Sequence, residues 1–87
     1  MNEKYILYVK KKCCFCVKAV SLLEEKQRQY SIIALGDNQK LLNEVKFANQ
    51  WPTFPIIFIQ DPDDAHSFRL IGGYTDLFEH FEAMDGW

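Results

Sequence analysis

Three cysteines lie within four residues near the start of the chain, directly after the lysine run 10–12. Cys13 and Cys16 form a C-x-x-C pair. At the start of a helix, unpaired backbone N–H groups and the positive end of the helix dipole favour a thiolate at the first cysteine. Cys16 follows one turn later, a spacing that allows it to form a disulfide with Cys13 or to release whatever Cys13 has bound. The pattern predicts Cys13 as a nucleophile and Cys16 as its partner thiol.

The chain has no cysteine outside this cluster. A structural disulfide framework would distribute an even number of cysteines along the sequence. A cluster of this kind in a reducing compartment is more often catalytic or metal-binding. A structural zinc site needs four ligands, and the only other soft candidates are His66 and His80, which are far apart in the sequence. Thiol chemistry is therefore favoured over zinc, and we expect both histidines to be ordinary surface residues.

The segments on either side of the cysteines have different periodicities. Tyr5–Val9 is aromatic and β-branched without a breaker, which predicts a buried strand rather than an amphipathic one. After the cysteines, Val17, Val20 and Leu23 recur near one face of a helix, with charged side chains on the other faces. The predicted order is strand, thiol turn, helix.

The rest of the chain alternates in the same way. The predicted elements are a strand over Tyr30–Leu35, a helix over Asn38–Gln50, strands over Pro55–Ile59 and Ser67–Ile71, and a last helix after Gly72-Gly73. Between the first two of these, Gly36-Asp37-Asn38 has the composition of a turn and a helix N-cap. The expected apolar stripes are Leu41, Leu42, Val45 and Ala48 in the second helix, and Tyr74, Leu77, Phe78, Phe81 and Met84 in the last. A right-handed crossover makes the first two strands parallel neighbours, and the short turn at Asp61–Asp64 makes the last two an antiparallel hairpin.

Length and composition limit the class of protein. Eighty-seven residues predict one domain over 1–87, and a hydrophobic content of 48% is ample for its core. The net charge of −2, with both signs interspersed, gives no footprint for nucleic acid. No stretch approaches the roughly 18 apolar residues of a membrane span, and the N-terminus lacks the layout of a signal peptide. We expect a soluble cytoplasmic protein with neither nucleic acid nor membrane as a partner.

The element order and the thiol turn together resemble the glutaredoxin branch of the thioredoxin superfamily. Four segments carry the resemblance in family order: Lys10-x-x-Cys13-x-x-Cys16, Thr53-Phe54-Pro55, Gly72-Gly73 and Tyr74-Thr75-Asp76-Leu77. The resemblance covers essentially the whole chain. It implies an α/β, thioredoxin-like fold, in which a four-stranded mixed sheet of order β-α-β-α-β-β-α has helices on both faces.

The resemblance also implies one ligand, glutathione, whose two carboxylates and one ammonium need complementary groups around the nucleophilic sulfur. Lys10 would pair with the glycine-end carboxylate. Thr53, Phe54 and Pro55 would also contribute to the glutathione site. Phe54 would present its backbone N–H and C=O to the tripeptide, and Pro55 would be cis and pack beside the thiols.

At the other end of the tripeptide, the start of the last helix is implicated. Backbone N–H groups of Thr75 and Asp76 would hold the γ-glutamyl carboxylate, and the Asp76 side chain would meet the ammonium. Gly73 allows the backbone to approach the ligand closely. Phe15 would form a wall beside the cysteinyl part.

By this resemblance the protein is a glutathione-disulfide oxidoreductase. The Cys13 thiolate would reduce protein disulfides and glutathione mixed disulfides, Cys16 would resolve the mixed disulfides formed with proteins, and glutathione would be the reducing co-substrate. Its partners would be disulfide-containing or glutathionylated proteins, of which ribonucleotide reductase is one served by the family. We expect a monomer.

Two departures from the family pattern leave alternatives open. Cys14 stands where most members have proline, which adds a third thiol. Trp51-Pro52-Thr53 and Phe15 resemble the monothiol branch, whose members bind a [2Fe–2S] cluster between two subunits through glutathione and one cysteine from each, here Cys13. Because Cys16 is retained where that branch has serine, dithiol exchange is favoured over cluster binding. A thioredoxin-like protein disulfide reductase is the other alternative.

Overall fold

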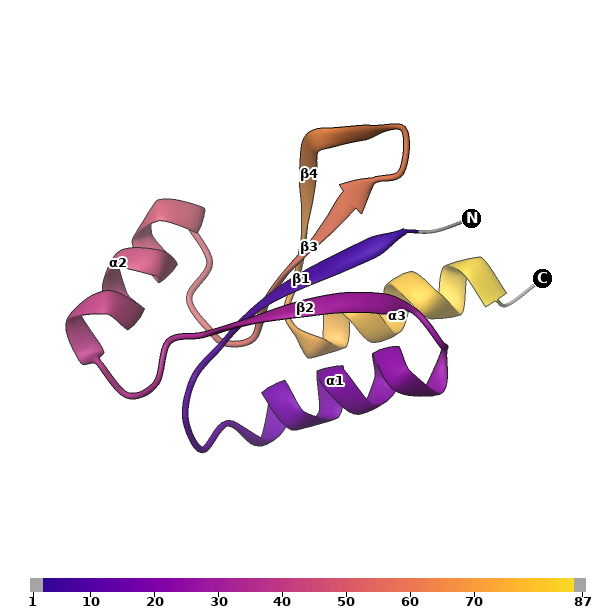
Figure 1. Cartoon of the computed structure of the whole chain (residues 1–87). Helices are drawn as coiled ribbons and strands as arrows, with labels where there is room; N and C mark the ends of the chain where they lie inside the picture. The colour runs from indigo at the N-terminus through magenta and orange to yellow at the C-terminus, as the bar shows by residue number, and fades with distance from the viewer. Residues whose placement is uncertain (1–2, 86–87) are drawn as a thin grey trace.

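The computed structural model describes residues 3–85 and contains one four-stranded sheet with three helices (Figure 1). The elements are β1 (Lys4–Val9), α1 (Cys14–Glu25), β2 (Gln29–Ala34), α2 (Gln39–Asn49), β3 (Ile56–Asp61), β4 (Asp64–Gly72) and α3 (Tyr74–Asp85). The strand order is β2-β1-β3-β4, in which β1 and β2 are parallel and the other pairs are antiparallel. The predicted element order, mixed sheet and thioredoxin-like fold are confirmed.

The main core lies between the sheet and the pair α1 and α3, which lie together beneath the sheet in Figure 1. Alternate residues of β1 point into it, and both Tyr5 and Leu7 are fully buried. Leu7 pairs with Ile57 of β3 and Leu77 of α3 packs in the same cluster. This core fixes the direction in which α1 and α3 run under the sheet.

The opposite face of the sheet is covered differently. A second cluster, made of Cys16, Leu42, Phe54 and Ile56, forms where α2 meets the sheet, and Tyr8 packs against it. In Figure 1, α2 lies beyond one end of the strands rather than across them. Consequently Ile6 and Tyr8 are only half-buried. The prediction of a uniformly buried first strand was wrong, because one of its faces has helical cover at one end only.

Several boundaries differ from prediction for local reasons. β4 begins at Asp64 rather than Ser67, because a tighter turn, in which Asp61 Oδ1 accepts the N–H of Asp63 at 2.9 Å, extends the hairpin. β3 begins at Ile56, one residue after Pro55, which has no N–H for the ladder. β2 is shifted by one residue, to Gln29–Ala34.

The predicted α2 is confirmed together with its cap. Asn38 is extended, and its side chain accepts the N–H of Leu41 at 3.2 Å. Gln50 ends the helix in the left-handed conformation, with φ of 52°.

The predicted buried face of α1 was partly wrong. Leu23 is fully buried and Val20 half-buried, but Val17 is 66% exposed. The face that packs in the core instead carries Cys16, Ala19, Leu22 and Leu23. Val17 is rotated about 100° from Cys16 on the helix, which turns it toward the flank of the sheet.

The stripes of α2 and α3 are narrower than predicted. In α2 only Leu42 is buried, because the helix touches the sheet at one end, while Leu41 and Ala48 are exposed. In α3, Leu77 and Phe81 are buried, whereas Phe78 and Met84 are exposed. Neither of these, nor α1, is long and apolar enough to cross a membrane, and no other helix is present in the described part of the chain.

His80 is not the ordinary surface residue that the sequence predicted. The Tyr5 hydroxyl donates to Glu3 at 2.9 Å, which leaves its oxygen to accept from Nε2 of His80 at 3.2 Å. The imidazole also packs edge-on against Tyr5 and Phe81. Burial is the main reason why the pKa of His80 is lowered, and the nearby Glu3 carboxylate opposes that change. His66, by contrast, is exposed as predicted.

The core assignment in α1 is testable with two truncations on the same helix. Leu23→Ala should lower the free energy of unfolding by about 2–5 kcal/mol, because it removes a fully buried side chain. Val17→Ala should change it by less than about 0.5 kcal/mol, because Val17 is mostly exposed. Urea unfolding followed by circular dichroism measures both. Similar losses in the two variants would contradict the orientation of α1.

The lowered pKa of His80 predicts an acid-sensitive contribution to stability. Above the unfolded-state pKa of about 6.5 the imidazole is neutral in both states, and the contribution is present. As the pH falls below that value, the unfolded chain takes up the proton first, so stability is lost until the folded-state pKa is passed. Unfolding free energies measured from pH 7.5 to 5 should decline less in His80→Gln than in the unchanged protein. Parallel curves would exclude His80 as the cause.

Candidate functional site: a thiol pair at two helix ends

The site begins in the loop that follows β1. The N–H of Lys11 donates to the Gly36 carbonyl at 2.9 Å, which ties this loop to the one after β2. Lys12 then adopts a left-handed conformation with φ of 57° and turns the chain into α1. Because β1 and β2 are parallel, both loops lie at the same edge of the sheet. Cys13 is thereby brought to the carboxyl end of the parallel strands β1 and β2.

Cys13 is the N-cap residue of α1. Its backbone is extended, with φ of −109° and ψ of 105°, and its Sγ accepts the N–H of Cys16 at 3.2 Å. The two cysteines form a disulfide across a Cα–Cα distance of 5.2 Å. The same sulfur lies 3.8 Å from the carbonyl oxygen of Phe54. Cys13 is partly exposed while Cys16 is 5% exposed, so the first sulfur is the accessible one.

A second helix end lies beside the first. The side chain of Asp76 accepts the N–H of Gly73 at 3.0 Å and so caps the start of α3. The rings of Phe15 in α1 and Tyr74 in α3 are stacked at a tilt, with centroids 6.1 Å apart. The first turns of both helices therefore open toward the same region, where their N–H groups and dipoles favour negative charge.

A groove runs between these helix ends; we call it the basic–acidic groove. One part, of about 400 Å³, has Lys10, Lys12 and Lys46 around Cys13. The other part, of about 210 Å³, reaches Thr75 and Asp76. Both parts are lined by Phe15, Thr53 and Phe54. The groove is thus cationic where it contains the reactive sulfur and has a carboxylate and a helix N-terminus at its far end.

The structure brings together nearly all the residues predicted from the sequence. Lys10, Cys13, Phe15, Thr53, Phe54, Gly73, Thr75 and Asp76 all line the basic–acidic groove. Pro55 follows a cis peptide bond, as predicted, but it is fully buried and does not line the groove. Pro55 directly follows Phe54, which lines both parts of the groove.

Six further residues line the groove that the sequence reasoning did not place there, namely Lys12, Cys14, Lys46, Trp51, Pro52 and Tyr74. Lys46 reaches it from α2, with its Nζ 5.7 Å from the ring centroid of Phe54. Trp51 lies at the other end, against Gly72 and Gly73. Cys14 is a free, exposed thiol beside Cys13. The family-like Trp51-Pro52-Thr53 segment was a signal for Trp51, but nothing in the sequence pointed to Lys46.

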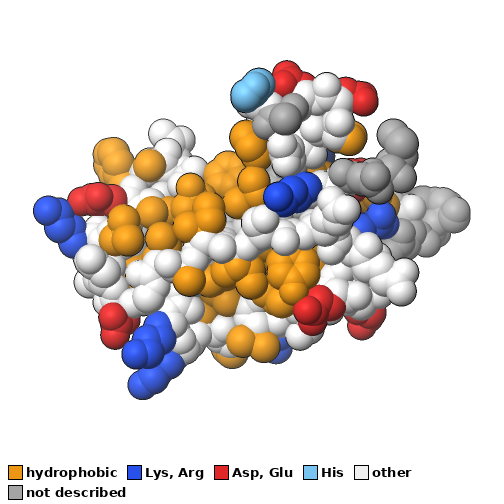
Figure 2. All heavy atoms as spheres, viewed as in Figure 1, with side chains coloured by type: hydrophobic (Ala, Val, Ile, Leu, Met, Phe, Trp, Pro, Cys, Tyr) orange, Lys and Arg blue, Asp and Glu red, His pale blue; other side chains and the backbone are white. Residues whose placement is uncertain are grey.

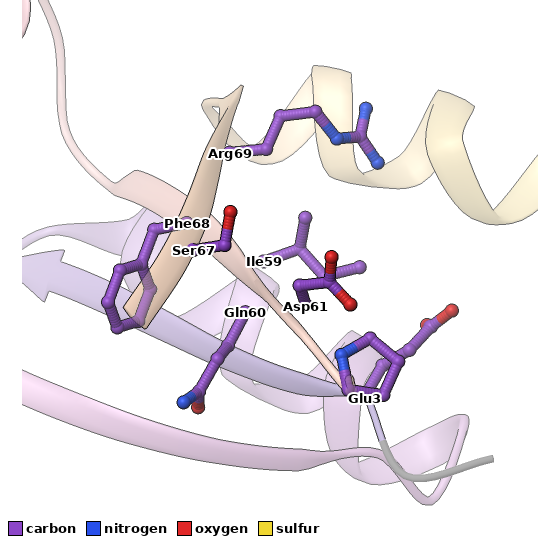
Figure 3. A pocket seen from close by; sticks show the side chains of 8 residues that line it. Glu3, Ile59, Gln60, Asp61, Ser67, Phe68 and Arg69 are labelled. Atoms are coloured by element: carbon purple, nitrogen blue, oxygen red, sulfur yellow. The ribbon is translucent and has the colours of Figure 1, made fainter. Parts of the chain in front are cut away.

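A separate cavity of about 310 Å³ lies at the opposite end of the sheet, around the β3–β4 hairpin (Figure 3). Phe68 and Gln60 point to one side of the strands there, and Arg69 and Ile59 to the other. Its polar groups do not converge and it contains no sulfur. Among residues 3–85, no three His, Cys, Asp or Glu side chains are placed to hold a metal ion.

The fold and the capped cysteine pair define a thioredoxin-fold protein with a redox-active C-x-x-C site. Residues 5–62, more than half of the chain, match the family model described as Glutaredoxin, and the chain belongs to that family. A search of the curated proteins found no match.

Two solved structures show how far the likeness extends. Glutaredoxin 1 from Francisella tularensis, complexed with cacodylate, is 24% identical with a TM-score of 0.70, over 98% of this chain and 99% of that one. A glutaredoxin from Brucella melitensis is 27% identical with a TM-score of 0.68, over 95% and 85% of the two chains. This chain is similar to both over nearly all of its own length.

The packing of Gly72 against the end of α3 gives a prediction. Its φ is +125°, and a Cβ added there would lie 2.6 Å from Oδ2 of Asp76 and 2.9 Å from the Trp51 ring. Gly36 is a matched control, because its φ is +67° but an added Cβ would meet nothing. Gly36→Ala should cost about 1–2 kcal/mol from the backbone alone. Gly72→Ala should cost at least about 1 kcal/mol more in urea unfolding, because side chains must also move. Equal losses would refute this packing.

Proposed function

We propose that this protein is a glutathione-dependent thiol-disulfide oxidoreductase. The observation that carries the proposal is the charge layout of the basic–acidic groove around Cys13. Glutathione has a carboxylate at its glycine end, and an ammonium and a second carboxylate at its γ-glutamyl end. Lys10 and Lys46 at the sulfur end complement the first, while Asp76 and the N–H groups of the first turn of α3 complement the others.

The middle of the tripeptide fits between these ends. Phe54 lies at the floor of both parts of the groove, and its carbonyl oxygen is already 3.8 Å from the Cys13 sulfur. Its backbone is therefore positioned to pair with the cysteinyl residue of glutathione as a neighbouring strand would. Phe15, which is 47% exposed and stacked on Tyr74, forms the opposite wall.

The reaction follows from the sulfur geometry. For a glutathionylated protein, the Cys13 thiolate attacks the glutathione sulfur, a Cys13–glutathione disulfide forms, and the protein leaves as a thiolate that takes up a proton. A second glutathione thiolate then attacks this bond, which restores Cys13 and releases oxidised glutathione. For a protein disulfide, the Cys13 thiolate attacks one substrate sulfur, and the other substrate sulfur leaves as a thiolate that takes up a proton. The Cys16 thiolate then attacks the Cys13 sulfur and releases the first substrate sulfur as a thiolate. Two glutathione molecules reduce the resulting Cys13–Cys16 disulfide and leave as oxidised glutathione.

The test uses a glutathione mixed disulfide, glutathione, NADPH and glutathione reductase, with NADPH oxidation as the readout. Cys13→Ser should abolish turnover, because no other sulfur caps α1. Cys16→Ser should retain much of it, because the monothiol route does not use Cys16. On protein disulfides, Cys16→Ser should lose most activity. Equal losses of the two variants on the mixed disulfide would contradict the assigned roles.

The alternatives give different results in companion measurements. A thioredoxin-like reductase would accept electrons from thioredoxin reductase and not from glutathione. A cluster carrier would show visible absorbance after anaerobic purification and a glutathione-dependent dimer. Calorimetry with S-methylglutathione tests whether glutathione binds in the basic–acidic groove. Lys46→Gln should weaken this binding. Lys40→Gln, a change on the same helix but outside the groove, should not. We place the protein in a reducing, cytoplasmic compartment, where glutathione is available.

A further inference from the structure

A second groove begins at the same sulfurs and runs in a different direction, between α1 and β2. Its volume is about 490 Å³. Cys13 and Cys16 lie at one end, with Val17, Val20 and Ile32 along its length. In the view shared by Figures 1 and 2, β2 lies in front of the sheet with α1 below it, and hydrophobic side chains form a band across this region. We call it the apolar groove.

The apolar side chains that line this groove are exposed to solvent instead of being buried in a core. Val17 is 66% exposed and Ile32 is 46% exposed. Single exposed aliphatic residues are common, but these two line one hollow next to a reactive sulfur. Glutathione has no apolar side chain to fill it. An occupant joined to Cys13 that fills this groove needs apolar side chains, which glutathione lacks.

The two grooves differ in which sulfur they contain. Cys13 lines both of them, whereas Cys16 lines only the apolar groove. Cys16 acts on the mixed disulfide between Cys13 and a protein, and is not needed for the one with glutathione. Cys13 lies where the two grooves meet, so a protein joined to Cys13 can extend along the apolar groove without occupying the basic–acidic groove.

The charges and the length of the apolar groove define its occupant further. Lys10 and Lys12 flank the sulfur end, and Glu24 lies at the far end, where its carboxylate accepts the Tyr30 hydroxyl at 2.7 Å. Glu24 follows Cys14 by ten positions along α1, which is a rise of about 15 Å. An extended chain covers that distance in about five residues, and alternate side chains face the same way.

We propose that the apolar groove binds the polypeptide segment of a substrate protein next to its reacting cysteine, in extended form. An apolar side chain two positions from that cysteine packs on Val17 and Ile32, and a basic side chain four positions from it lies near Glu24. This inference rests on disulfide exchange at Cys13. It divides the site into a groove for the small co-substrate and a groove for the protein.

The test measures single-turnover reduction by the pre-reduced protein without glutathione. The substrate is the disulfide-linked dimer of a symmetric peptide, Lys-Ser-Val-Ser-Cys-Ser-Val-Ser-Lys, which presents the same pattern in both chain directions. The protein dithiol becomes the Cys13–Cys16 disulfide, and the peptide disulfide becomes two thiols. Hydroxyethyl disulfide is the small-molecule comparison, since it cannot fill the groove.

The double change Val17→Thr and Ile32→Thr keeps the branched shape and removes apolar surface. It should lower the second-order rate constant for the peptide about fivefold, from lost apolar burial, with hydroxyethyl disulfide unaffected. Phe47→Thr is the control, because Phe47 is 86% exposed on α2 and lines neither groove. Equal losses on both substrates, or no loss on the peptide, would overturn the inference.

A charge exchange provides an independent arm. Glu24→Lys should shift the preference for the lysine peptide over its glutamate counterpart by about threefold or more toward glutamate, the size expected for exposed ion pairs. Glu25→Lys adds the same charge at an exposed neighbour outside the groove and should leave the ratio unchanged. Equal shifts in both variants would indicate a general field and refute a bound segment. The two proposals can fail separately. If the reduced protein acts on the peptide but glutathione does not regenerate the reduced protein, the proposal of glutathione dependence fails. The rate ratios for the two peptides still test whether the apolar groove binds the substrate segment.

Discussion

The arrangement of the site depends on one extended residue at a helix start. Cys13 ends the loop after β1 and caps α1 with its own side chain, so its sulfur accepts a backbone N–H and faces the carbonyl of Phe54. A sulfur that serves as a helix cap is stabilised as an anion by the same N–H groups and dipole that it satisfies. The same N-cap contact therefore stabilises the start of α1 and favours the thiolate form of the cysteine that makes it.

The sheet determines what surrounds that sulfur. The parallel pairing of β1 with β2 places the lysine loop beside α1, and the antiparallel β3 brings Phe54 to the same edge. The core beneath the sheet holds α1 and α3 side by side, so two helix N-termini face one groove. An anionic, zwitterionic ligand suits such a groove, because positive dipole ends and lysines lie near one carboxylate and Asp76 lies near the opposite end.

The residues missed from the sequence share a cause. For the helices that contain Lys46 and Val17, the apolar periodicity predicts one face that is buried along its whole length. α2 meets the sheet at one end only, which leaves Lys46 free to reach over Phe54. α1 packs against the core through its own residues Ala19 and Leu23, so Val17 faces outward. Periodicity finds a helix and its approximate face, but the width of the buried stripe depends on how much of a neighbour it touches.

The sequence by itself determined the element order, the thiol pair and the cap at Asn38, because each depends on residues a few positions apart. It also indicated the Thr53-Phe54-Pro55 and Gly72-Gly73 segments through their likeness to a family. Only the tertiary structure decided that these segments meet, that Cys16 opens to one groove and not the other, and that His80 is packed on Tyr5. Those relations join residues distant in sequence, and their geometry is set by strand pairing and core packing.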